Sequence, residues 1–331
     1  MKNYQVVSIG GATRDIIFYT DRGKIVANSK DLICPKLIGF EYGGKIISKK
    51  IHFGLGGGGC NTAICLAKLG FKVANIVSIG EDREGDCISE HLKGAKIDIN
   101  LIKINKKIAS GFSFFIIDDK TKEHVAFLYR GANDYLDINE HDLKKFKTKW
   151  FFVSSLSGKN WLSISKKIIT KIKKDKTKLA WNPGETQLAA GKRGLIGLLK
   201  YCDILILNRD ESTELVVSVR GKIKGINNPR VLIKEIYRWG PKIFVLTDGR
   251  RGAYAYDGKK IYFSKIYDIP VVDTTGAGDC FGASFLAGLL LYKGDIKKAL
   301  KMGIYNTAGE VSKVGAQNGL LSLKQIKKFI K

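Results

Sequence analysis

Apolar residues along this chain occur in two alternating patterns, short continuous runs and longer stretches with helical spacing. The first run, at residues 4–9, ends at Gly10 and Gly11, which predicts a buried strand followed by a tight turn. From residue 150 onward, the two patterns alternate regularly, as expected for βαβ units and a mostly parallel sheet. Expected strands cover 73–79, 150–154, 178–181, 204–207, 242–247, 252–256 and 260–264, and expected helices cover 61–70, 162–173, 210–217, 231–239, 281–292, 296–311 and 323–330.

Two stretches depart from this alternation and are rich in β-prone residues. In the first, pieces at 16–19, 24–27 and 46–52 are separated by the turn signals Asp21-Arg22-Gly23 and Gly43-Gly44. In the second, strands at 111–117 and 124–129 flank a turn at 118–122. We expect these stretches to pair as a small β-sheet lid, formed by about residues 16–53 and 97–130, on a single α/β domain that spans residues 1–331.

Composition fits a globular protein of enzyme size. No apolar run approaches the roughly 20 residues that a membrane span requires, and residues 1–5 lack the apolar core of a secretory signal. The six cysteines are scattered without a Cys-x-x-Cys pair, which indicates neither a disulfide framework nor a zinc site. We therefore expect a cytoplasmic location, no membrane partner and reduced thiols.

The formal net charge of +26 could attract nucleic acid. However, only 11 of the 57 basic residues are arginines, the better residue for forked phosphate contacts, and the lysines are spread along the chain. Short lysine clusters fall on helical patterns, where long side chains cover apolar surface while their charged ends stay in water. We expect no dedicated nucleic-acid partner.

The run Asp273-Thr274-Thr275-Gly276-Ala277-Gly278-Asp279 carries the strongest chemical signal. Its glycines let backbone amides turn inward just before an apolar helix, and such amides together with the helix dipole form an anion site. Asp279 would lie in the first turn of that helix, beside a bound phosphoryl group, where a carboxylate can accept a proton from an attacking hydroxyl. The alternative is an Asp that only caps the helix.

A second glycine run, at residues 56–59, precedes Asn61 and another helical pattern. A dinucleotide site is the competing interpretation, but the spacing differs from that fingerprint and no acidic residue follows in the expected strand region. We favour a loop that faces a sugar, with Asn61 forming hydrogen bonds to hydroxyl groups.

The run at 273–279 resembles the C-terminal signature of the ribokinase-like (PfkB) family of carbohydrate and nucleoside kinases, and the run at 56–63 resembles its N-terminal signature. Further similarity extends from about residue 6 to residue 317. The resemblance implies a ribokinase-like three-layer α/β/α fold with a mostly parallel central sheet and a small β-sheet lid. It also implies transfer of the terminal phosphoryl group of a nucleotide, ATP rather than ADP by expectation, to a hydroxyl of a small carbohydrate. Asp279 would be the general base, and the amides of Gly276, Ala277 and Gly278 would form the anion hole.

The resemblance also assigns residues to the acceptor side of the site. Asp15, which follows Gly10 and Gly11, would accept hydrogen bonds from two sugar hydroxyls, although it could instead cap a turn. Arg130 would approach a polar or acidic acceptor, although a salt bridge within the lid is an equal alternative. The implied acceptor-binding set is Asp15, Gly57, Gly58, Asn61, Arg130 and Asn133.

On the nucleotide side, Asn208 and Glu211 resemble a motif that organises Mg²⁺ through water. The same two residues could form a capping box at a helix start, and both interpretations can hold together. Thr247, Gly249 and Gly252 resemble a loop that contacts nucleotide phosphates. Asp273, Thr275 and Gly315 resemble a monovalent cation site, so K⁺ is a third candidate ion or cofactor beside ATP and Mg²⁺.

Two alternative functions remain open from the sequence. A nucleoside kinase of the same family would need an aromatic wall for a base, which Phe112, Phe114, Phe127 and Tyr129 could supply, although strand spacing also fits a lid core. A non-catalytic sugar or nucleotide sensor would keep the fold without turnover. In either case, the small-molecule partner is a sugar or a nucleoside, and an exposed lid edge favours a homodimer through the lid.

Overall fold

The computed structural model describes residues 1–28, 36–120, 124–221 and 223–330. Its largest element is an eight-stranded sheet with the order β16-β15-β14-β13-β12-β11-β1-β6. The six strands from β14 to β6 are parallel, and β15 and β16 extend one edge antiparallel. The strands are β1 (Lys2–Ile9), β6 (Val73–Ile76), β11 (Phe146–Val153), β12 (Lys178–Trp181), β13 (Ile204–Asn208), β14 (Ile243–Thr247), β15 (Ala253–Tyr256) and β16 (Ile261–Ser264).

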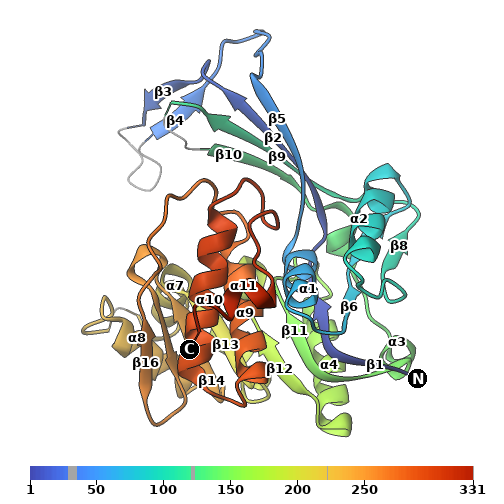
Figure 1. Cartoon of the computed structure of the whole chain (residues 1–331), viewed down its shortest axis with the longest axis vertical. Coiled ribbons are helices and arrows are strands. Elements are labelled where there is room, and N and C mark those ends of the chain that lie inside the picture. The colour runs from blue at the N-terminus through green and yellow to red at the C-terminus, as the bar shows by residue number, and fades with distance from the viewer. Residues whose placement is uncertain (29–35, 121–123, 222, 331) are drawn as a thin grey trace.

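Helices cover both faces of this sheet (Figure 1). Both sides of each strand are therefore buried, which explains why the strands are continuous apolar runs in the sequence. Alternate residues of β1 enter two separate cores: Val6 packs on one face, and Val7 and Ile9 pack on the other. The first face carries α1 (Gly58–Lys68), α2 (Arg83–Gly94), α9 (Ala277–Leu291), α10 (Ile296–Val311) and α11 (Leu323–Ile326). The second carries α3 (Glu140–Lys144), α4 (Trp161–Asp175), α5 (Glu185–Leu188), α6 (Gly191–Leu199), α7 (Arg209–Arg220) and α8 (Pro229–Tyr237). The expected three-layer α/β/α fold is confirmed.

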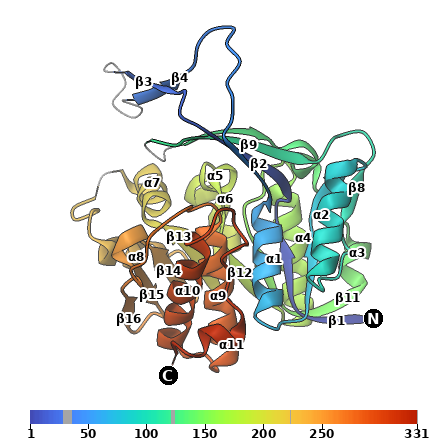
Figure 2. The same cartoon turned by 45° about the horizontal axis from the view of Figure 1, so that its top comes forward.

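A separate four-stranded sheet projects from this body (Figures 1 and 2). Its order is β10-β9-β2-β5, with a parallel pair β9–β2 at its centre and antiparallel pairs at both edges. The strands are β2 (Thr13–Thr20), β5 (Lys50–Gly56), β9 (Gly111–Asp118) and β10 (His124–Tyr129). A hairpin of β3 (Lys24–Ala27) and β4 (Lys36–Gly39) extends beyond it. Part of the expected turn at 118–122 lies outside the described residues.

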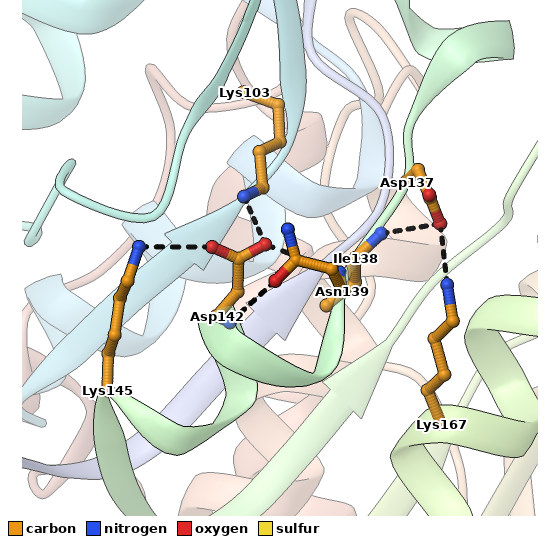
Figure 3. Close-up of polar contacts among 7 residues, drawn as sticks. All are labelled: Lys103, Asp137, Ile138, Asn139, Asp142, Lys145 and Lys167. Atoms are coloured by element: carbon orange, nitrogen blue, oxygen red, sulfur yellow. Dashed lines mark hydrogen bonds and ion pairs between the residues drawn. The ribbon is translucent and has the colours of Figure 1, made fainter.

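Residues 97–110, which we expected in the lid, lie with the α/β body instead. There β8 (Lys103–Asn105) pairs in parallel with β7 (Ser78–Gly80). Figure 3 shows the reason: Lys103 and Lys145 both donate to the carboxylate of Asp142 in α3, and Asn139 completes a capping box with Asp142. Although burial raises the pKa of Asp142, these lysine contacts hold it below its usual range. A buried, doubly paired carboxylate thus fastens β8 to the body.

Other boundaries also differ from the sequence-based expectation. α1 and α9 begin three and four residues earlier than expected, at Gly58 and Ala277, because glycine and alanine turns add no apolar periodicity at a helix start. The expected strand 73–79 is split between β6 and β7, and α11 is shorter than its apolar pattern. Among the described residues, no helix has the length and apolar character needed to cross a membrane.

Candidate active site

The site lies where the parallel strands of the large sheet end. Gly10 follows β1, Ser154 follows β11, and Asn208 and Thr247 are the last residues of β13 and β14. Carboxyl ends of parallel strands lie at one edge of a sheet, and ligands of such folds bind outside that edge. The motifs that follow these strands therefore lie side by side along this edge, in the same order as in the sequence.

The run at 273–279 forms a turn that leads directly into α9. Gly276 has φ 85°, and a Cβ atom on it would lie 2.4 Å from the Cβ of Ala316, so only glycine fits here. The carboxylate of Asp273 accepts hydrogen bonds from the backbone N–H groups of Thr275 at 2.9 Å and Gly315 at 2.8 Å. The three residues expected at a monovalent cation site are thus brought together, and Asp273 ties the turn to the C-terminal loop.

The amide groups of this turn are not equivalent. The N–H of Ala277 donates to the carbonyl oxygen of Thr274 at 3.2 Å, which differs from its expected use in an anion hole. Gly278 is exposed and lies in the first turn of α9, where backbone N–H groups lack partners within the helix. In this conformation, Gly278 is therefore better placed than Ala277 to bind an anion.

Asp279 lies in the first turn of α9, as expected, and is half-buried. Its Oδ2 accepts a hydrogen bond from Nδ2 of Asn61 at 2.9 Å. A Cβ atom on Gly58 would lie 3.0 Å from Oδ1 of Asp279, so the missing side chain at Gly58 leaves the carboxylate open on that side. Burial raises the pKa of Asp279 above its ordinary value, and the hydrogen bond from Asn61 opposes this rise.

The glycine run at 56–59 brings α1 against the turn that follows β1. Gly57 has φ 86°, and a Cβ atom on it would lie 2.5 Å from the carbonyl carbon and oxygen of Gly11. The N–H groups of Gly59 and Cys60 donate to that same oxygen at 3.0 and 3.2 Å. This close approach places Asn61, which is buried, next to Asp279.

Asp15 and Ser113 occupy facing positions of β2 and β9, and the Ser113 hydroxyl donates to the Asp15 carboxylate. Asp15 is buried, and its burial raises its pKa, while hydrogen bonds from Ser113 and Thr13 oppose that rise. A Cβ atom on Gly56 would overlap Oδ2 of Asp15, so this carboxylate adjoins the glycine run at 56–59. Asp15 thus lies within a strand of the lid beside the glycine run, and it is not a turn cap.

Asn133 and Arg130 make contacts that the sequence did not specify. The Asn133 amide pairs with Ala12 at two points, accepting from its N–H and donating to its carbonyl oxygen, each at 2.8 Å. It therefore holds the segment that leads into Asp15. The guanidinium of Arg130 lies 3.8 Å from the carboxylate of Glu185, whose side chain is 89% exposed, so this pair stabilises little.

The lid aromatics lie on the sheet face opposite Asp15. Phe112 and Phe114 neighbour Ser113 along β9, and adjacent residues of a strand point to opposite faces. Register places Tyr129 beside Phe112 and Phe127 beside Phe114. The four rings therefore do not face the same space as the Asp15 carboxylate.

A pocket of about 380 Å³ lies on the other side of the turn at 273–279. Four of the five residues expected on the nucleotide side line it, together with Ala277 and Gly278. These four are Asn208, Thr247, Gly249 and Gly252, whereas Glu211 is not part of the lining. The structure thus brings together four residues that are spread over 45 positions of the sequence and joins them to the start of α9.

Sequence reasoning missed the apolar wall of this pocket. Residues 266–269 and Val271 form one side, and Ile304, Ala308 and Val311 of α10 form another. The α10 residues recur at helical spacing, which is the same pattern that a core-facing helix shows. An open wall of this kind, with few polar groups, suits a flat heterocyclic base.

Asn208 and Glu211 form the capping box of α7, each side chain accepting from the other's N–H at 2.8 Å. The bond uses one of the two Glu211 carboxylate oxygens. Burial and the charges of Asp210 and Glu214 raise the pKa of Glu211, against the effect of the Asn208 N–H. Carboxylate and amide oxygens at a pocket edge with surplus negative charge fit water-mediated Mg²⁺ binding.

Glu310 of α10 is a site-proximal residue that sequence reasoning missed. It is fully buried, and neither carboxylate oxygen has a hydrogen-bond partner among the described residues. Burial, together with the charges of Asp273 and Asp279, raises its pKa to about 9. Glu310 is therefore a neutral acid at pH 7. A charged residue on the buried, mostly apolar face of α10 was the available signal.

Comparisons with known proteins show the family and the fold of this chain. Residues 5–323 match the model of the pfkB family carbohydrate kinases. A 5-dehydro-2-deoxygluconokinase of Clostridium botulinum is 28% identical over 301 residues, which cover 86% of this chain and 87% of that protein. Two solved structures share the fold with a TM-score of 0.78: a Methanocaldococcus jannaschii nucleoside kinase (18% identity, 100% of this chain and 98% of that one) and an Arabidopsis thaliana ribokinase complexed with ribose and ATP (21%, 100% and 99%). Because the family model spans nearly the whole chain, this protein belongs to the pfkB family of carbohydrate kinases.

Proposed function

We propose that this kinase transfers the terminal phosphoryl group of ATP to a hydroxyl group of a small carbohydrate, with Asp279 as the general base. One observation carries the proposal: Asp279 lies between the nucleotide pocket, which its neighbour Gly278 lines, and the glycine loop, whose Asn61 and Gly58 adjoin its carboxylate. A base in that place can take the proton from an acceptor hydroxyl as the hydroxyl attacks the terminal phosphorus.

The surrounding residues support a division of roles. Asp15 would accept hydrogen bonds from acceptor hydroxyls, with Gly57 and Gly58 leaving room for the sugar and Arg130 at its margin. The amides at the start of α9 would stabilise the charge that develops on the transferred group. Asn208 and Glu211 would hold Mg²⁺ through water, and the ion would neutralise phosphate charge when bound. Thr247, Gly249 and Gly252 would contact the phosphates.

Two further features belong to the proposal. Asp273, Thr275 and Gly315 would bind a monovalent cation such as K⁺, because they meet at the loop that shapes the anion site. The proposed reaction consumes ATP, which is available in the cytoplasm, so we expect the enzyme to act there. The lid sheet would close over the acceptor and exclude water, which otherwise competes as the phosphoryl acceptor.

We also propose a homodimer through the outer face of the lid. Ile51, Phe53, Phe127 and Tyr129 are exposed there, and Phe53 and Phe127 expose 52% and 57% of their surface. These residues lie on one face by register, and Phe114 and Ile16 lie between Phe127 and Phe53, so apolar positions run across this face from edge to edge. Patches of this kind mark interaction sites, and a second copy would offer the same patch across a two-fold axis.

A phosphorylation screen tests the activity. The purified protein is incubated with Mg²⁺, with ATP or ADP as donor, and with sugars, sugar acids, sugar phosphates or nucleosides, and the used donor is measured. We expect ATP-dependent phosphorylation of a sugar or sugar acid. Activity on nucleosides alone would reject the carbohydrate assignment, and ligand binding without turnover in any arm would indicate a sensor.

A further inference from the structure

Four polar side chains form a continuous row from α2 to the Asp279 carboxylate. Nε2 of His91 lies 2.9 Å from Oε1 of Gln317. Nε2 of Gln317 donates to Oδ1 of Asn61 at 2.8 Å, and Nδ2 of Asn61 donates to Asp279 at 2.9 Å. The members come from α2, the C-terminal loop, α1 and α9, so only the folded chain brings them together.

The Asp279 end of this row fixes the direction of every hydrogen bond in it. An ionised Asp279 carboxylate can only accept, so Asn61 must turn its NH₂ group toward it and its carbonyl oxygen toward Gln317. Gln317 must then donate to Asn61 and present its own oxygen to His91, which donates from Nε2. A reversed amide anywhere in the row would place two acceptors in contact, so each member sets the orientation of the next.

Burial makes this orientation consequential. Asn61 is only 4% exposed, so water has little access to replace a lost partner. A buried amide oxygen without a donor costs more free energy than a solvated one. Without Gln317, the Asn61 carbonyl oxygen would lose its donor, and the contact with Asp279 alone would hold the amide in the orientation that the base needs.

The outer end of the row belongs to a helix that is attached to the lid. Near its start, Glu84 of α2 pairs with Arg14 of β2 at 3.1 Å. The cap residue Asp82 accepts from both the N–H and the hydroxyl of Ser110, just before β9. Thus α2 contacts β2 and the residue before β9 at one end and Gln317 at the other.

We propose that His91 and Gln317 are positioning residues of the phosphoryl transfer: they hold the Asn61 amide with its nitrogen toward the base and thereby keep Asp279 ionised and oriented. This inference rests on the proposed role of Asp279. The hydrogen bond from Asn61 favours the charged form of the carboxylate, so the row stabilises the state that accepts the proton.

The test compares variants with and without a donor at each position. Gln317→Leu and His91→Phe remove the hydrogen bonds, whereas His91→Gln keeps an N–H donor of similar reach. We expect kcat to fall about tenfold for Gln317→Leu and several-fold for His91→Phe, with the KM for the acceptor nearly unchanged. His91→Gln should regain most of the loss. His141→Phe, at an exposed position of α3, is the matched control and should behave as wild type.

The pH profile separates positioning from a merely structural role. Loss of a hydrogen bond to the charged form raises the pKa of Asp279, so the acidic limb of kcat should move to higher pH in Gln317→Leu. Unchanged kcat and an unchanged limb in both donor-less variants would overturn the inference, and so would a rise in KM alone. If Gln317→Leu does not fold, the comparison of His91→Phe with His91→Gln tests the inference, because His91 is exposed. Asp279→Asn, assayed beside them, keeps the two proposals apart. Full turnover by that variant rejects the base and the positioning role with it, whereas loss of turnover in Asp279→Asn together with wild-type behaviour of the His91 and Gln317 variants rejects the positioning role alone.

Discussion

The Asp279 carboxylate and the Asn61 amide, 218 positions apart in the sequence, meet through a hydrogen bond of 2.9 Å. This contact joins the start of α9, which borders the nucleotide pocket, to the start of α1, which follows the lid strand β5. The glycine runs at 56–59 and 273–279 therefore both adjoin the Asp279 carboxylate. Five expected outcomes follow from this geometry and its surroundings.

Asp279→Asn removes the proposed base but keeps the side-chain volume. We expect kcat to fall at least about a hundredfold, the usual scale for loss of general-base catalysis, while ATP still binds. Steady-state kinetics and calorimetric titration measure the two effects. Asp86→Asn, at an exposed position of α2, is the control. Near-normal turnover of Asp279→Asn would remove Asp279 from the mechanism.

Asp15→Asn changes the acceptor side of the site. A buried carboxylate that accepts from sugar hydroxyls contributes to binding in the ground state and in the transition state alike, so the KM for the sugar should rise about tenfold or more. The KM for ATP should stay unchanged, because Asp15 belongs to the lid. Ser113→Ala should have a smaller effect in the same direction. An equal rise in both KM values would contradict a role specific to the acceptor.

Gly57→Ala and Gly70→Ala form a matched pair, since φ is 86° and 89° at the two positions. A Cβ atom on Gly70 meets nothing within 4 Å, whereas one on Gly57 meets the Gly11 backbone at 2.5 Å. We expect Gly70→Ala to lower the free energy of unfolding by about 1–2 kcal/mol and Gly57→Ala by roughly 3 kcal/mol or more. Denaturant titration checks both, and equal losses would show that conformation, not contact, dominates.

Glu310→Gln should stabilise the protein in a pH-dependent way. The pKa of Glu310 is about 9 when folded, against an ordinary value of 4.5, so the folded state holds a proton that the unfolded state releases above pH 4.5. The native protein thus loses stability as pH rises from about 4.5 to 9, and the neutral Gln does not. Thermal unfolding should show a higher Tm for Glu310→Gln at pH 8 and little difference at pH 4. The same difference at both pH values would exclude this linkage.

Phe127→Glu tests the outer lid face. A charge buried in an apolar contact between two copies costs several kcal/mol, enough to separate a dimer at micromolar concentration. Sedimentation should show a dimer for the wild type and a monomer for Phe127→Glu. Val217→Glu, at an exposed position of α7, should remain dimeric. A monomeric wild type would refute the lid dimer.

Local sequence determined much of this protein. Continuous apolar runs specified the strands of the large sheet, because a strand covered on both faces has no polar side to show. The run at 273–279 specified a turn into a helix, since Gly276 occupies a conformation that suits glycine. The capping box of Asn208 and Glu211 was equally visible, because its partners are three residues apart.

The tertiary structure alone decided the rest, because it depends on contacts between distant segments. Periodicity cannot tell whether Ile304, Ala308 and Val311 pack into a core or line a pocket, since both uses need the same apolar face of a helix. Strand register, set by pairing with β9, put Asp15 on one face of the lid sheet and the aromatic rings of Phe112 and Phe114 on the other. The attachment of β8 to Asp142 and the burial of Glu310 likewise arise only when separate elements pack together. The sequence thus predicted the chemistry that we propose for Asp279, while the fold determined which side chains surround that carboxylate and how they are oriented.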